Sequence, residues 1–458
     1  MHTAHPRGLS PTEVGDFLAL IGKEREQRLR EAARRIRKQV GAGTLWHVNS
    51  TAAGGGVAEM LHILVPLYRQ LGIPVRWAVI DGDDRFFDVT KRLGNLAYGS
   101  VDPADRLDPA DVDHYLTRSA MEAKELLALV GTRDLVLLHD HQTAALVPDL
   151  AGAVRGVFWR CHVGVDAPTA GSRAAWDVLA PLLERADAAI FSIARHIPER
   201  LPDHQVAVIP PVIWPYSPKN EPVPRRMRGP YLERAGLGRE RPPGYVVSEG
   251  AWDPAQPLVV QVSRWDRLKD MHAVLAGFVE GVPDARLALV GPDPTAIADD
   301  VEQRRWFEVC RAAWSELPDR DRTRVRLTCL PMANGDDNAR LVNVVQRTAD
   351  VVVQKSLAEG FGLTVTEAMW KGRAVVGSAV GGIAAQIEHG RTGLLLADPG
   401  DLKQFAELVT LVTEGQVDGP GLGARARRHV RDTYLPDADL LAVDELLSTH
   451  TTGQESPR

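Results

Sequence analysis

The chain has 458 residues, of which 44% are hydrophobic and 25% are charged, and its formal net charge is −6. This length is typical of two to three globular domains that can bury complete hydrophobic cores. The small negative charge offers no basic field for nucleic-acid phosphates, so the composition argues against a nucleic-acid-binding protein.

The cysteines and the apolar runs indicate a cellular setting. Cys161, Cys310 and Cys329 lie far apart and fit neither a disulfide framework nor a C-x-x-C metal pattern. They suit a reducing compartment, so we expect a cytoplasmic protein. No apolar run reaches the ~18 residues that span a bilayer, and the N-terminus lacks a signal peptide's hydrophobic core.

The first expected element is a helix over Phe17–Val40, where apolar residues recur at helical spacing among many arginines. Its basic face is interrupted by Glu24, Glu26 and Glu31. This interruption favours packing of the helix onto its own domain, with contact to a membrane surface as the alternative.

Farther along, short β-rich apolar runs alternate with helical stretches, which is the pattern of parallel sheets covered on both faces. The first set of expected strands is Leu45–Val48, Val75–Asp81, Leu135–His139, Val157–His162, Ala189–Ile193 and Val206–Ile209. The second set is Leu258–Val262, Leu287–Gly291, Val325–Leu330, Val351–Gln354, Ala374–Val376 and Gly393–Leu396.

Between the two sets, residues 210–257 are rich in proline, glycine and charge, as expected for a linker and a variable loop. We therefore predict an α/β protein with two Rossmann-like doubly wound domains, residues 1–215 and 216–423, facing a central cleft. A terminal helix over residues 424–448 is expected to pack back on the first domain. Ligands of such sheets bind outside the carboxyl ends of the strands.

The first chemical motif is a glycine turn, Gly54–Gly56, between an expected strand and an expected helix. Three glycines permit close approach of a ligand to the main chain, and free amides at a helix start attract anions. An ordinary tight turn is the competing interpretation. The turn does not match G-x-G-x-x-G, so it does not indicate a nicotinamide or flavin site.

The second motif follows the first strand of the second domain and contains Arg264 and Lys269. Both cations could converge on one diphosphate, since guanidinium and ammonium groups both pair with phosphate oxygens. The alternative is that both are solvated surface charges.

The third motif holds two carboxylates, Glu359 and Glu367, with seven residues between them, around a glycine turn and a helix start. Thr364 and Glu367 also match a capping box, so Glu367 could serve only to cap the helix. Glu359 lies beside two glycines and has no such role. A carboxylate there can accept hydrogen bonds from sugar hydroxyls.

The fourth motif is the strand around Phe158 that ends in His162. A histidine at the carboxyl end of a strand is placed to face the ligand cleft of an α/β domain. A structural histidine with satisfied hydrogen bonds is equally consistent with the pattern.

In chain order, these four motifs resemble the retaining nucleotide-sugar glycosyltransferases built from two Rossmann-like domains, the GT-B type. More narrowly, the runs His47–Leu61, Trp159–His162 and Gln354–Ile383 look like the trehalose glycosyltransferring synthases. Members of that family join glucose from a nucleotide donor to free glucose. The resemblance extends from Thr44 to about Leu396.

The resemblance implies roles for the motif residues. Lys269 and Arg264 would hold the donor diphosphate, Glu367 the ribose hydroxyls, and Glu359 the donor sugar, with His162 beside the reacting sugar. The implied catalytic residues are His162, Glu359, Arg264 and Lys269. The implied donor-binding residues are Arg264, Lys269, Glu359, Gly360, Phe361, Gly362, Leu363 and Glu367. The implied acceptor and phosphate loop consists of Gly54, Gly55, Gly56, Asp140, His141 and Gln142.

By the same resemblance, the first domain binds the acceptor and the second binds the nucleotide sugar. No protein nucleophile is expected. The acceptor hydroxyl would attack from the leaving-group side, and the departing phosphate would take its proton, so catalysis would rest on positioning and charge stabilisation.

Several positions depart from the family pattern. His141 and Thr143 stand where prolines are more familiar, Trp214 where an acidic residue is common, and Asp270 where glycine is common. The proline-rich stretch Pro218–Gln256 is longer than expected. These departures concern the acceptor more than the donor, and His141 could be a surface loop residue instead of an acceptor contact.

Three functions compete. The leading one is a retaining glucosyltransferase that forms α,α-trehalose or a close analogue. The second is a trehalose phosphorylase, in which inorganic phosphate replaces the donor diphosphate; Glu367 favours a nucleotide, because a phosphorylase needs no ribose contact. The third is a non-catalytic sugar-nucleotide-binding protein, which the presence of His162, Lys269 and Glu359 disfavours.

Nucleoside-diphosphate glucose is the expected donor substrate, and no tightly bound cofactor is expected. A metal is not required, since the two cations can neutralise the diphosphate; His139, Asp140 and His141 are the nearest candidate ligands. The expected partners are the sugar donor, the acceptor and a second copy of the chain in a homodimer.

Overall fold

The computed structural model describes residues 1–238, 246–296 and 301–451. The chain divides into two compact units. Unit 1 contains residues 1–213 and the C-terminal segment from residue 434, and unit 2 contains residues 214–433. The segment expected as one terminal helix over residues 424–448 is therefore split between the units.

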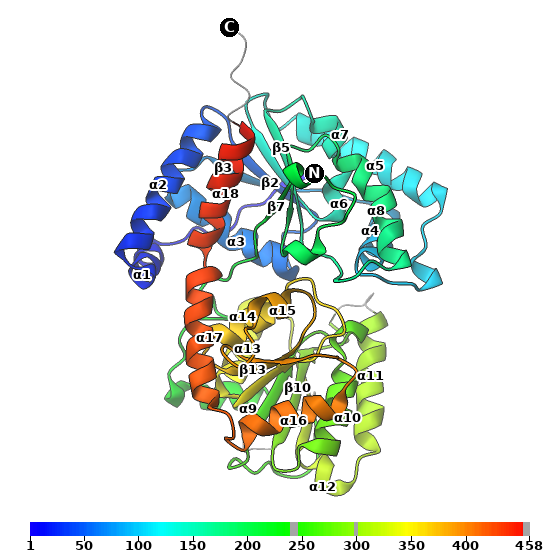
Figure 1. Cartoon of the computed structure of the whole chain (residues 1–458), viewed down its shortest axis with the longest axis vertical. Helices are drawn as coiled ribbons and strands as arrows, with labels where there is room; N and C mark the ends of the chain where they lie inside the picture. Colours follow the sequence, from blue (N-terminus) through cyan, green and yellow to red (C-terminus); the bar gives the residue numbers. More distant parts are fainter. Residues whose placement is uncertain (239–245, 297–300, 452–458) are drawn as a thin grey trace. The chain divides into compact units, whose positions relative to one another are not determined.

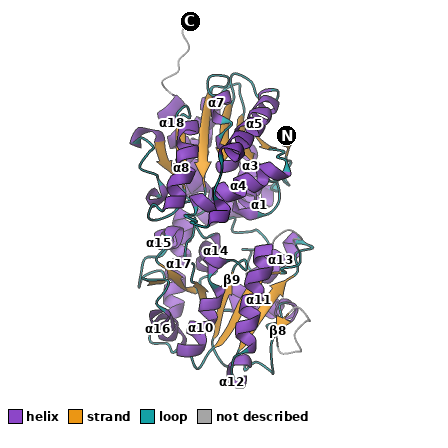
Figure 2. Ribbon diagram, turned by 90° about the vertical axis from the view of Figure 1, so that its right-hand side faces the viewer, coloured by secondary structure: helices purple, strands orange, loops and turns teal. Residues whose placement is uncertain are grey.

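Unit 1 is a sheet with helices on both faces (Figures 1 and 2). Its strand order is β1-β3-β2-β4-β5-β6-β7, and every neighbouring pair is parallel except β1 with β3. The strands are β1 (His2–Thr3), β2 (Leu45–Asn49), β3 (Val75–Val79), β4 (Leu135–His139), β5 (Gly156–Cys161), β6 (Ala188–Phe191) and β7 (Val206–Val208).

The helices of unit 1 come from both ends of its sequence. They are α1 (Pro11–Ile21), α2 (Lys23–Val40), α3 (Gly55–Gln70), α4 (Asp84–Ala97), α5 (Pro109–Leu127), α6 (His141–Ala144), α7 (Val147–Leu150), α8 (Ala170–Leu183) and α18 (Pro436–Thr451). Helices α2 and α18 lie side by side although about 400 residues separate them in the sequence (Figure 1).

Unit 2 has the strand order β14-β13-β12-β9-β10-β11-β8, in which only the β8 and β11 pair is antiparallel. The strands are β8 (Val246–Val247), β9 (Leu258–Val262), β10 (Arg286–Pro292), β11 (Val325–Leu330), β12 (Val351–Gln354), β13 (Ala374–Ser378) and β14 (Leu394–Leu396). The helices are α9 (Arg228–Arg234), α10 (Met271–Gly281), α11 (Val301–Ser315), α12 (Asp319–Arg322), α13 (Gly335–Thr348), α14 (Leu363–Trp370), α15 (Gly381–Gln386), α16 (Leu402–Thr413) and α17 (Gly419–Thr433).

The strands expected from the sequence are all present, with ends that differ by at most two residues. The expected parallel strands pair in parallel, and each sheet has one antiparallel pair at an edge. The two-residue strands β1 and β8 each add an antiparallel pair, and they are too short to carry a periodic signal. Part of the proline-rich stretch Pro218–Gln256, residues 239–245, lies outside the described residues.

The helix expected over Phe17–Val40 is two helices. Gly22, with a φ of 82°, ends α1 and precedes α2, and glycine adopts this backbone conformation without a steric penalty. The apolar positions Phe17, Leu29, Ile36 and Val40 are fully buried, so the two helices pack onto unit 1. Among the described residues, no helix combines the length and the hydropathy that a membrane crossing needs.

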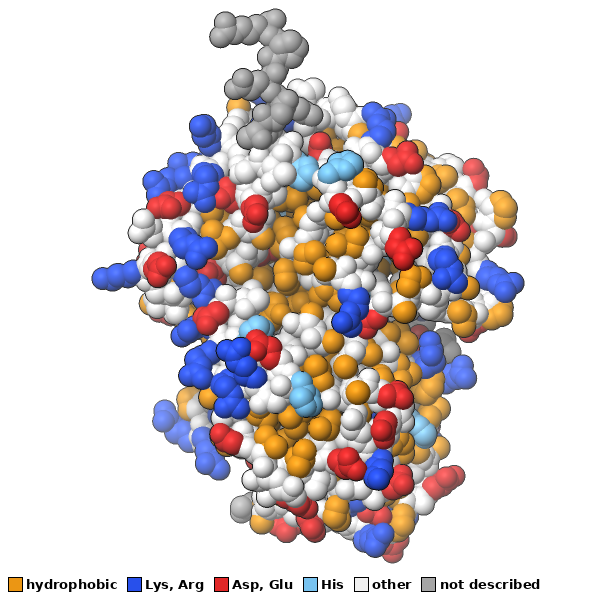
Figure 3. All heavy atoms as spheres, viewed as in Figure 1, with side chains coloured by type: hydrophobic (Ala, Val, Ile, Leu, Met, Phe, Trp, Pro, Cys, Tyr) orange, Lys and Arg blue, Asp and Glu red, His pale blue; other side chains and the backbone are white. Residues whose placement is uncertain are grey.

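The surface carries charges of both signs. On the face shown in Figure 3, basic and acidic side chains are interspersed with neutral and apolar ones. The three cysteines are free thiols and all are buried.

Candidate active site

Both sheets reverse their winding direction next to residues that the motifs singled out. In unit 1 the chain winds one way from β2 to β3 and the other way from β2 to β4. In unit 2 the reversal lies between β9 and β12. Ligands of open α/β sheets bind at the carboxyl ends of the strands at such a reversal.

At the reversal point of unit 1, three histidines form a column across neighbouring strands. His47 Nδ1 lies 3.0 Å from His139 Nε2, and His139 Nδ1 lies 3.2 Å from His162 Nε2. The rings are stacked, with centroids 5.3 and 5.5 Å apart and interplanar angles of 22° and 15°. We call these three residues the histidine column.

Strand register explains the column. His139 is in register with Arg160, and His47 with Leu137. His139 therefore lies two residues closer to the carboxyl edge than His47, and His162 lies two residues closer than His139. All three are on the same face of the sheet. The intervening positions, such as Val48, Leu138 and Cys161, point into the apolar core on the other face.

A second polar group lies beneath the column. The buried Arg160 guanidinium forms an ion pair of 2.9 Å with Asp439 of α18 and donates to the carbonyls of Ile209 and Pro210. The Tyr68 hydroxyl donates to the same Asp439 at 2.9 Å, and the Tyr68 ring meets His47 edge-on. Helix α18 thus supplies the counter-charge that lets Arg160 be buried beneath this face of the sheet.

Burial keeps the column uncharged. It lowers the pKa of His47 to about 3, with the Arg160 charge adding to the effect. Burial also takes the pKa of His139 and His162 well below the ordinary value, again with repulsion from Arg160. At neutral pH the three imidazoles are therefore neutral, and each carries one proton on one of its two nitrogens.

Asp140 directly follows the column residue His139 and has a strained backbone. Its φ of 63° and ψ of 176° fall in a region that is essentially restricted to glycine. Its carboxylate accepts from the His162 amide at 2.7 Å, and the Trp159 indole donates to its carbonyl at 2.8 Å. Burial raises the pKa of Asp140 to about 7. Strain and a perturbed pKa together are typical of functional sites.

His141 is not a surface residue, so that alternative is wrong. It begins the short helix α6 and is 6% exposed, and a Cβ on Gly94 would come within 2.8 Å of its ring. Burial lowers the pKa of His141 to about 4. Gln142 follows in the same helix and is partly exposed. Asp140, His141 and Gln142 thus share one turn at the carboxyl edge of β4.

The glycine turn is exposed. Gly54 and Gly55 have φ values of 75° and 79°, and α3 begins at Gly55, so Gly56 lies in its first turn. A Cβ at Gly54 or Gly55 would meet nothing within 4 Å. Backbone conformation, not crowding, therefore requires glycine at these two positions.

At the reversal point of unit 2, Lys269 and Glu359 form a two-pronged ion pair. The Lys269 ammonium donates to both carboxylate oxygens of Glu359, at 2.8 and 2.7 Å. Lys269 ends a single turn of 3-10 helix after β9, and Glu359 lies in the loop after β12. Their side chains are 18% and 9% exposed, so a small ligand can reach the pair.

Neutral side chains hold this pair in place. Gln261 on β9 donates to the Lys269 carbonyl at 2.6 Å and accepts from the Lys355 amide. The Ser356 hydroxyl donates to Glu359 at 3.2 Å and accepts from Gln354. These buried supports fix the main chain at Lys269 and orient the Glu359 carboxylate.

Arg264 has a different partner. Its guanidinium pairs with Asp266 at 2.9 Å, and its side chain is 62% exposed. Asp266 also caps the turn that carries Lys269. In this structure Arg264 therefore does not share an anionic partner with Lys269.

Asp270 has a positive φ of 50° with a ψ of 38°, the left-handed conformation. This geometry accounts for the expectation of glycine at position 270. Here the Asp270 carboxylate forms an ion pair with the buried Lys355 ammonium. An aspartate tolerates the left-handed conformation better than most residues, and this ion pair compensates for its remaining cost.

The capping box expected from Thr364 and Glu367 is absent. Helix α14 begins at Leu363 with Gly362 as its N-cap, in the left-handed conformation with φ 84°, and no side chain caps it. The Thr364 hydroxyl instead donates to Gln354. Because the helix starts two residues earlier than a Thr364 cap requires, the capping interpretation of Glu367 is wrong.

The loop before α14 is held by its main chain. Gln386 donates to the carbonyl of Phe361 at 2.6 Å, and Gly382 packs so closely that a Cβ would lie 2.3 Å from the Phe361 Cα. Gly360 and Phe361 are buried, and a Cβ on Gly362 would meet the Glu359 side chain at 3.0 Å. Gly360, Phe361, Gly362 and Leu363 thus follow directly on Glu359.

Glu367 lies in a basic environment that the sequence did not reveal. It is 2% exposed, and the Lys219 ammonium lies 3.6 Å from its carboxylate. The buried Lys371 ammonium donates to Asn220, to Gln346 and to the Glu367 carbonyl. Burial lowers the pKa of Lys371 to about 7, which attraction to Glu367 partly offsets.

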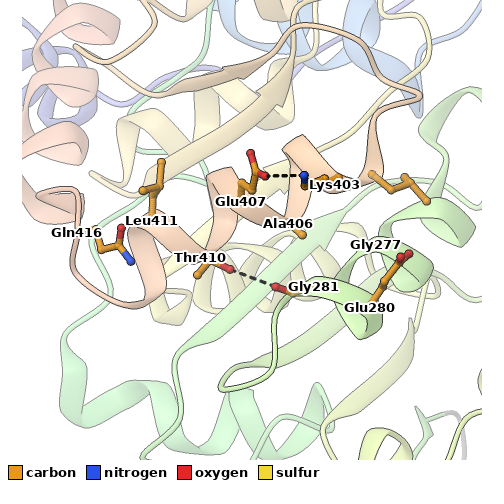
Figure 4. A pocket seen from close by; sticks show the side chains of 10 residues that line it. Gly277, Glu280, Gly281, Lys403, Ala406, Glu407, Thr410, Leu411 and Gln416 are labelled. Atoms are coloured by element: carbon orange, nitrogen blue, oxygen red, sulfur yellow. Dashed lines mark hydrogen bonds and ion pairs between the residues drawn. The ribbon is translucent and has the colours of Figure 1, made fainter.

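One hollow of unit 2 lies away from these residues. It has a volume of about 650 Å³ and lies between α10 and α16 (Figure 4). It is lined by Gly277, Glu280, Gly281, Leu402, Lys403, Ala406, Glu407, Thr410, Leu411 and Gln416. None of the motif residues lines it, so we do not assign the reaction to this hollow.

A metal centre was considered at His139, Asp140 and His141. In the described part of the chain, no group of three or more His, Cys, Asp or Glu side chains is arranged to hold a metal ion. The imidazole nitrogens of the histidine column point at one another instead of converging on a common point.

Sequence reasoning missed the column itself, because His47 and His139 were not assigned to the site. A signal was present: three expected parallel strands each carry a histidine at their last or next-to-last position, and the carboxyl ends of such strands share one edge. Three further charged residues had no local signal, because their partners lie far away in the sequence. Lys219 lies 148 residues from Glu367, and Lys371 lies 151 residues from Asn220. Asp439 lies 279 residues from Arg160.

Two protein families match the chain. Residues 47–198 match the family described as trehalose synthase, N-terminal domain, and residues 331–429 match glycosyl transferases group 1. The trehalose synthase of Pyrococcus horikoshii is 34% identical over 426 residues, which is 92% of this chain and 93% of that protein.

The chain is also similar to a more distant relative and to a solved structure. The trehalose phosphorylase of Grifola frondosa is 25% identical over 84% of this chain but only 54% of its own length. A crystal structure of an α,α-trehalose-phosphate synthase (UDP-forming) from Burkholderia vietnamiensis superposes with a TM-score of 0.66 at 18% identity, covering 88% of this chain and 96% of that one. This likeness confirms the expected fold of two doubly wound α/β domains.

Proposed function

We propose, since this chain belongs to the trehalose synthase family of glycosyltransferases, that it moves glucose from a nucleoside-diphosphate glucose to free glucose. The products are α,α-trehalose and the nucleoside diphosphate. The configuration of the donor carbon is retained. The observation that carries the proposal is the 34% identity over 92% of the chain, together with the Lys269 and Glu359 pair at the reversal point of unit 2.

Lys269 is the group that neutralises the leaving diphosphate. In the structure its ammonium is already held in place and is neutralised by Glu359. When the donor binds, Lys269 turns to the phosphate oxygens and Glu359 to hydroxyls of the glucosyl group. The exposed Arg264 guanidinium exchanges its partner Asp266 for the same diphosphate. As the bond between the donor carbon and phosphate breaks, these cations stabilise the charge that develops on the leaving oxygen.

Glu367 binds the ribose. Its buried carboxylate lies 3.6 Å from the Lys219 ammonium, and a carboxylate there can accept hydrogen bonds from two neighbouring hydroxyls. The amides from Gly360 to Leu363 lie at the start of α14, where the helix dipole favours negative charge, and they meet the donor phosphates and sugar. Glu359 and Glu367 thus act on opposite ends of the donor.

On the acceptor side, His162 contacts the transferred sugar, and Asp140, His141 and Gln142 contact the acceptor glucose. Gly54, Gly55 and Gly56 allow acceptor and phosphate to approach the main chain. The acceptor hydroxyl attacks the donor carbon on the face that the phosphate leaves. Its proton passes to the departing phosphate oxygen, so no protein nucleophile takes part.

Incubation with a panel of nucleoside-diphosphate glucoses and free glucose, without phosphate, tests the proposal. We expect an α,α-linked disaccharide and one equivalent of nucleoside diphosphate. Proton NMR of the anomeric resonances identifies the linkage. A β configuration at the carbon that comes from the donor would refute retention. Donor binding without any product would refute glucose as the acceptor.

Phosphorolysis is the second candidate, because the similarity extends to a fungal trehalose phosphorylase. Trehalose with inorganic phosphate and no nucleotide separates the two. Release of glucose 1-phosphate would establish the phosphorylase. We expect trehalose to be consumed only when a nucleoside diphosphate is supplied.

A further inference from the structure

The histidine column restricts where its protons can lie. A hydrogen bond between two neutral imidazoles needs one N–H and one unprotonated nitrogen. His139 has only one proton and uses both of its nitrogens, one toward His47 and one toward His162. Its proton therefore decides the direction of both contacts.

Only two neutral arrangements satisfy both contacts. In the first, His47 donates from Nδ1 to His139, and His139 donates from Nδ1 to His162, which leaves the His162 proton on its own Nδ1. In the second, every proton is on Nε2 and every donation runs the other way. The two arrangements differ in what the ends of the column present.

The buried end of the column, at His47, selects between the two proton arrangements. His47 Nε2 is buried and has no hydrogen-bond partner. In the second arrangement this atom would be a buried N–H without an acceptor, and in the first it is an unprotonated nitrogen. A buried orphan donor is rarer and more costly than a buried orphan acceptor. The first arrangement is therefore favoured.

The charged and titratable neighbours do not reverse this choice. Arg160 keeps its positive charge in its ion pair with Asp439, and the Tyr68 proton is used on the same carboxylate. Asp140 accepts from the main-chain amide of His162. None of these hydrogen bonds supplies an acceptor to His47 Nε2.

We propose that His139, backed by His47, is a positioning residue that fixes His162 as a neutral imidazole with its proton on Nδ1. This inference rests on the proposed function for its consequence: His162 donates a hydrogen bond to an oxygen of the transferred sugar and cannot act as a base toward it. The site thereby requires a sugar hydroxyl opposite His162. A deoxy sugar that lacks this oxygen would leave the donor unpaired and would be rejected.

The direct test is nitrogen NMR of the full chain labelled with ¹⁵N-histidine at pH 7, with assignment through single variants. We expect His162 to show a protonated Nδ1 and an unprotonated Nε2. The reverse pattern, or an equal mixture of tautomers, would overturn the inference whatever the activity.

Variants test the direction of the column. His139→Phe removes the donor to His162, so a mixture of tautomers is expected, with turnover reduced on the order of tenfold and the donor KM changed by less than about twofold. His139→Gln keeps an amide donor and should restore much of the turnover and the Nδ1 tautomer. His47→Phe should leave His162 protonated on Nδ1.

His114→Phe is the matched control, because His114 lies in the same unit, outside the column, and is paired with Asp83. It should change neither the tautomer nor turnover. If His139→Phe fails to fold, the wild-type and His139→Gln spectra still decide the tautomer. If the tautomer is as expected but His162→Phe keeps full turnover, the assigned role of His162 fails while the column stands.

Discussion

The reversal points of the two sheets bring together opposite kinds of chemistry. In unit 1 three neutral imidazoles pass hydrogen bonds from strand to strand, and in unit 2 an ammonium and a carboxylate neutralise each other. A neutral column cannot exchange its partners without breaking its own hydrogen bonds, so it fixes orientation. An ion pair can give both of its members to a charged ligand. Under the proposed function, unit 1 therefore orients the sugar and unit 2 stabilises developing charge.

Lys269→Ala is the strongest test of this division. It should lower turnover by about a hundredfold or more and weaken binding of nucleoside diphosphate, because the cation acts on charge present in both ground and transition states. Isothermal titration and initial rates measure both effects. Lys403→Ala, on the exposed face of α16, is the control. Unaltered nucleotide affinity would contradict the role of Lys269.

Glu359→Gln should have the next largest effect. We expect turnover to fall about thirtyfold, or roughly 2 kcal/mol, since one charged hydrogen bond to the sugar is weakened. Nucleoside-diphosphate binding should be largely retained, in contrast to Lys269→Ala. Glu407→Gln serves as the surface control. A variant with normal turnover would remove Glu359 from the site.

Asp140→Asn extends the comparison to stability. The folded-state pKa of about 7 lies above the ordinary value near 3.8, so the folded state holds a proton that the unfolded state releases between these pH values. Wild-type stability therefore falls as pH rises from 4 to 7. The variant lacks this loss, so its melting temperature should exceed that of the wild type at pH 8 by several degrees, corresponding to about 1–3 kcal/mol.

Differential scanning calorimetry at pH 4.5 and pH 8 measures the effect. At pH 4.5 the two proteins should melt at similar temperatures. An equal difference at both pH values would show that the Asp140 carboxyl titrates normally in the folded state.

Arg264→Ala should have the smallest effect. Because the side chain is 62% exposed and pairs only with Asp266, the melting temperature should stay within about 1 °C. Donor affinity should fall less than tenfold and converge with that of the wild type at high salt. A loss of donor affinity as large as that of Lys269→Ala would mean that Arg264 contributes as much as Lys269 to binding the diphosphate.

The predictability of these two regions differs for a physical reason. Glu359, Lys269 and their strands could be predicted because each motif is local, and the order of motifs follows the order of strands. The column could have been predicted only by combining three strand ends. The capping interpretation of Glu367 failed because Gly362, in the left-handed conformation, starts α14 before Thr364.

Pairing between distant segments was beyond local patterns. Nothing around Asp439 indicates that its carboxylate balances Arg160, because the terminal stretch predicts only a helix. The partner of Asp270 likewise depends on the course of β12, which brings Lys355 to it. Such pairs follow from burial, which requires a counter-charge but does not specify where in the chain it comes from.

The position of Asp439 has a consequence for the order in which the protein matures during synthesis. The chain leaves unit 1 after Ile213 and returns at Tyr434, where the Ile213 amide donates to the Tyr434 carbonyl at 3.0 Å. A growing chain emerges from its N-terminus, so Arg160 must wait until residue 439 has been translated before its counter-ion exists. Unit 2, whose residues are contiguous, is complete earlier. The first unit to be made is therefore the last to be finished, and any truncation before α18 should leave unit 1 with a buried, uncompensated arginine.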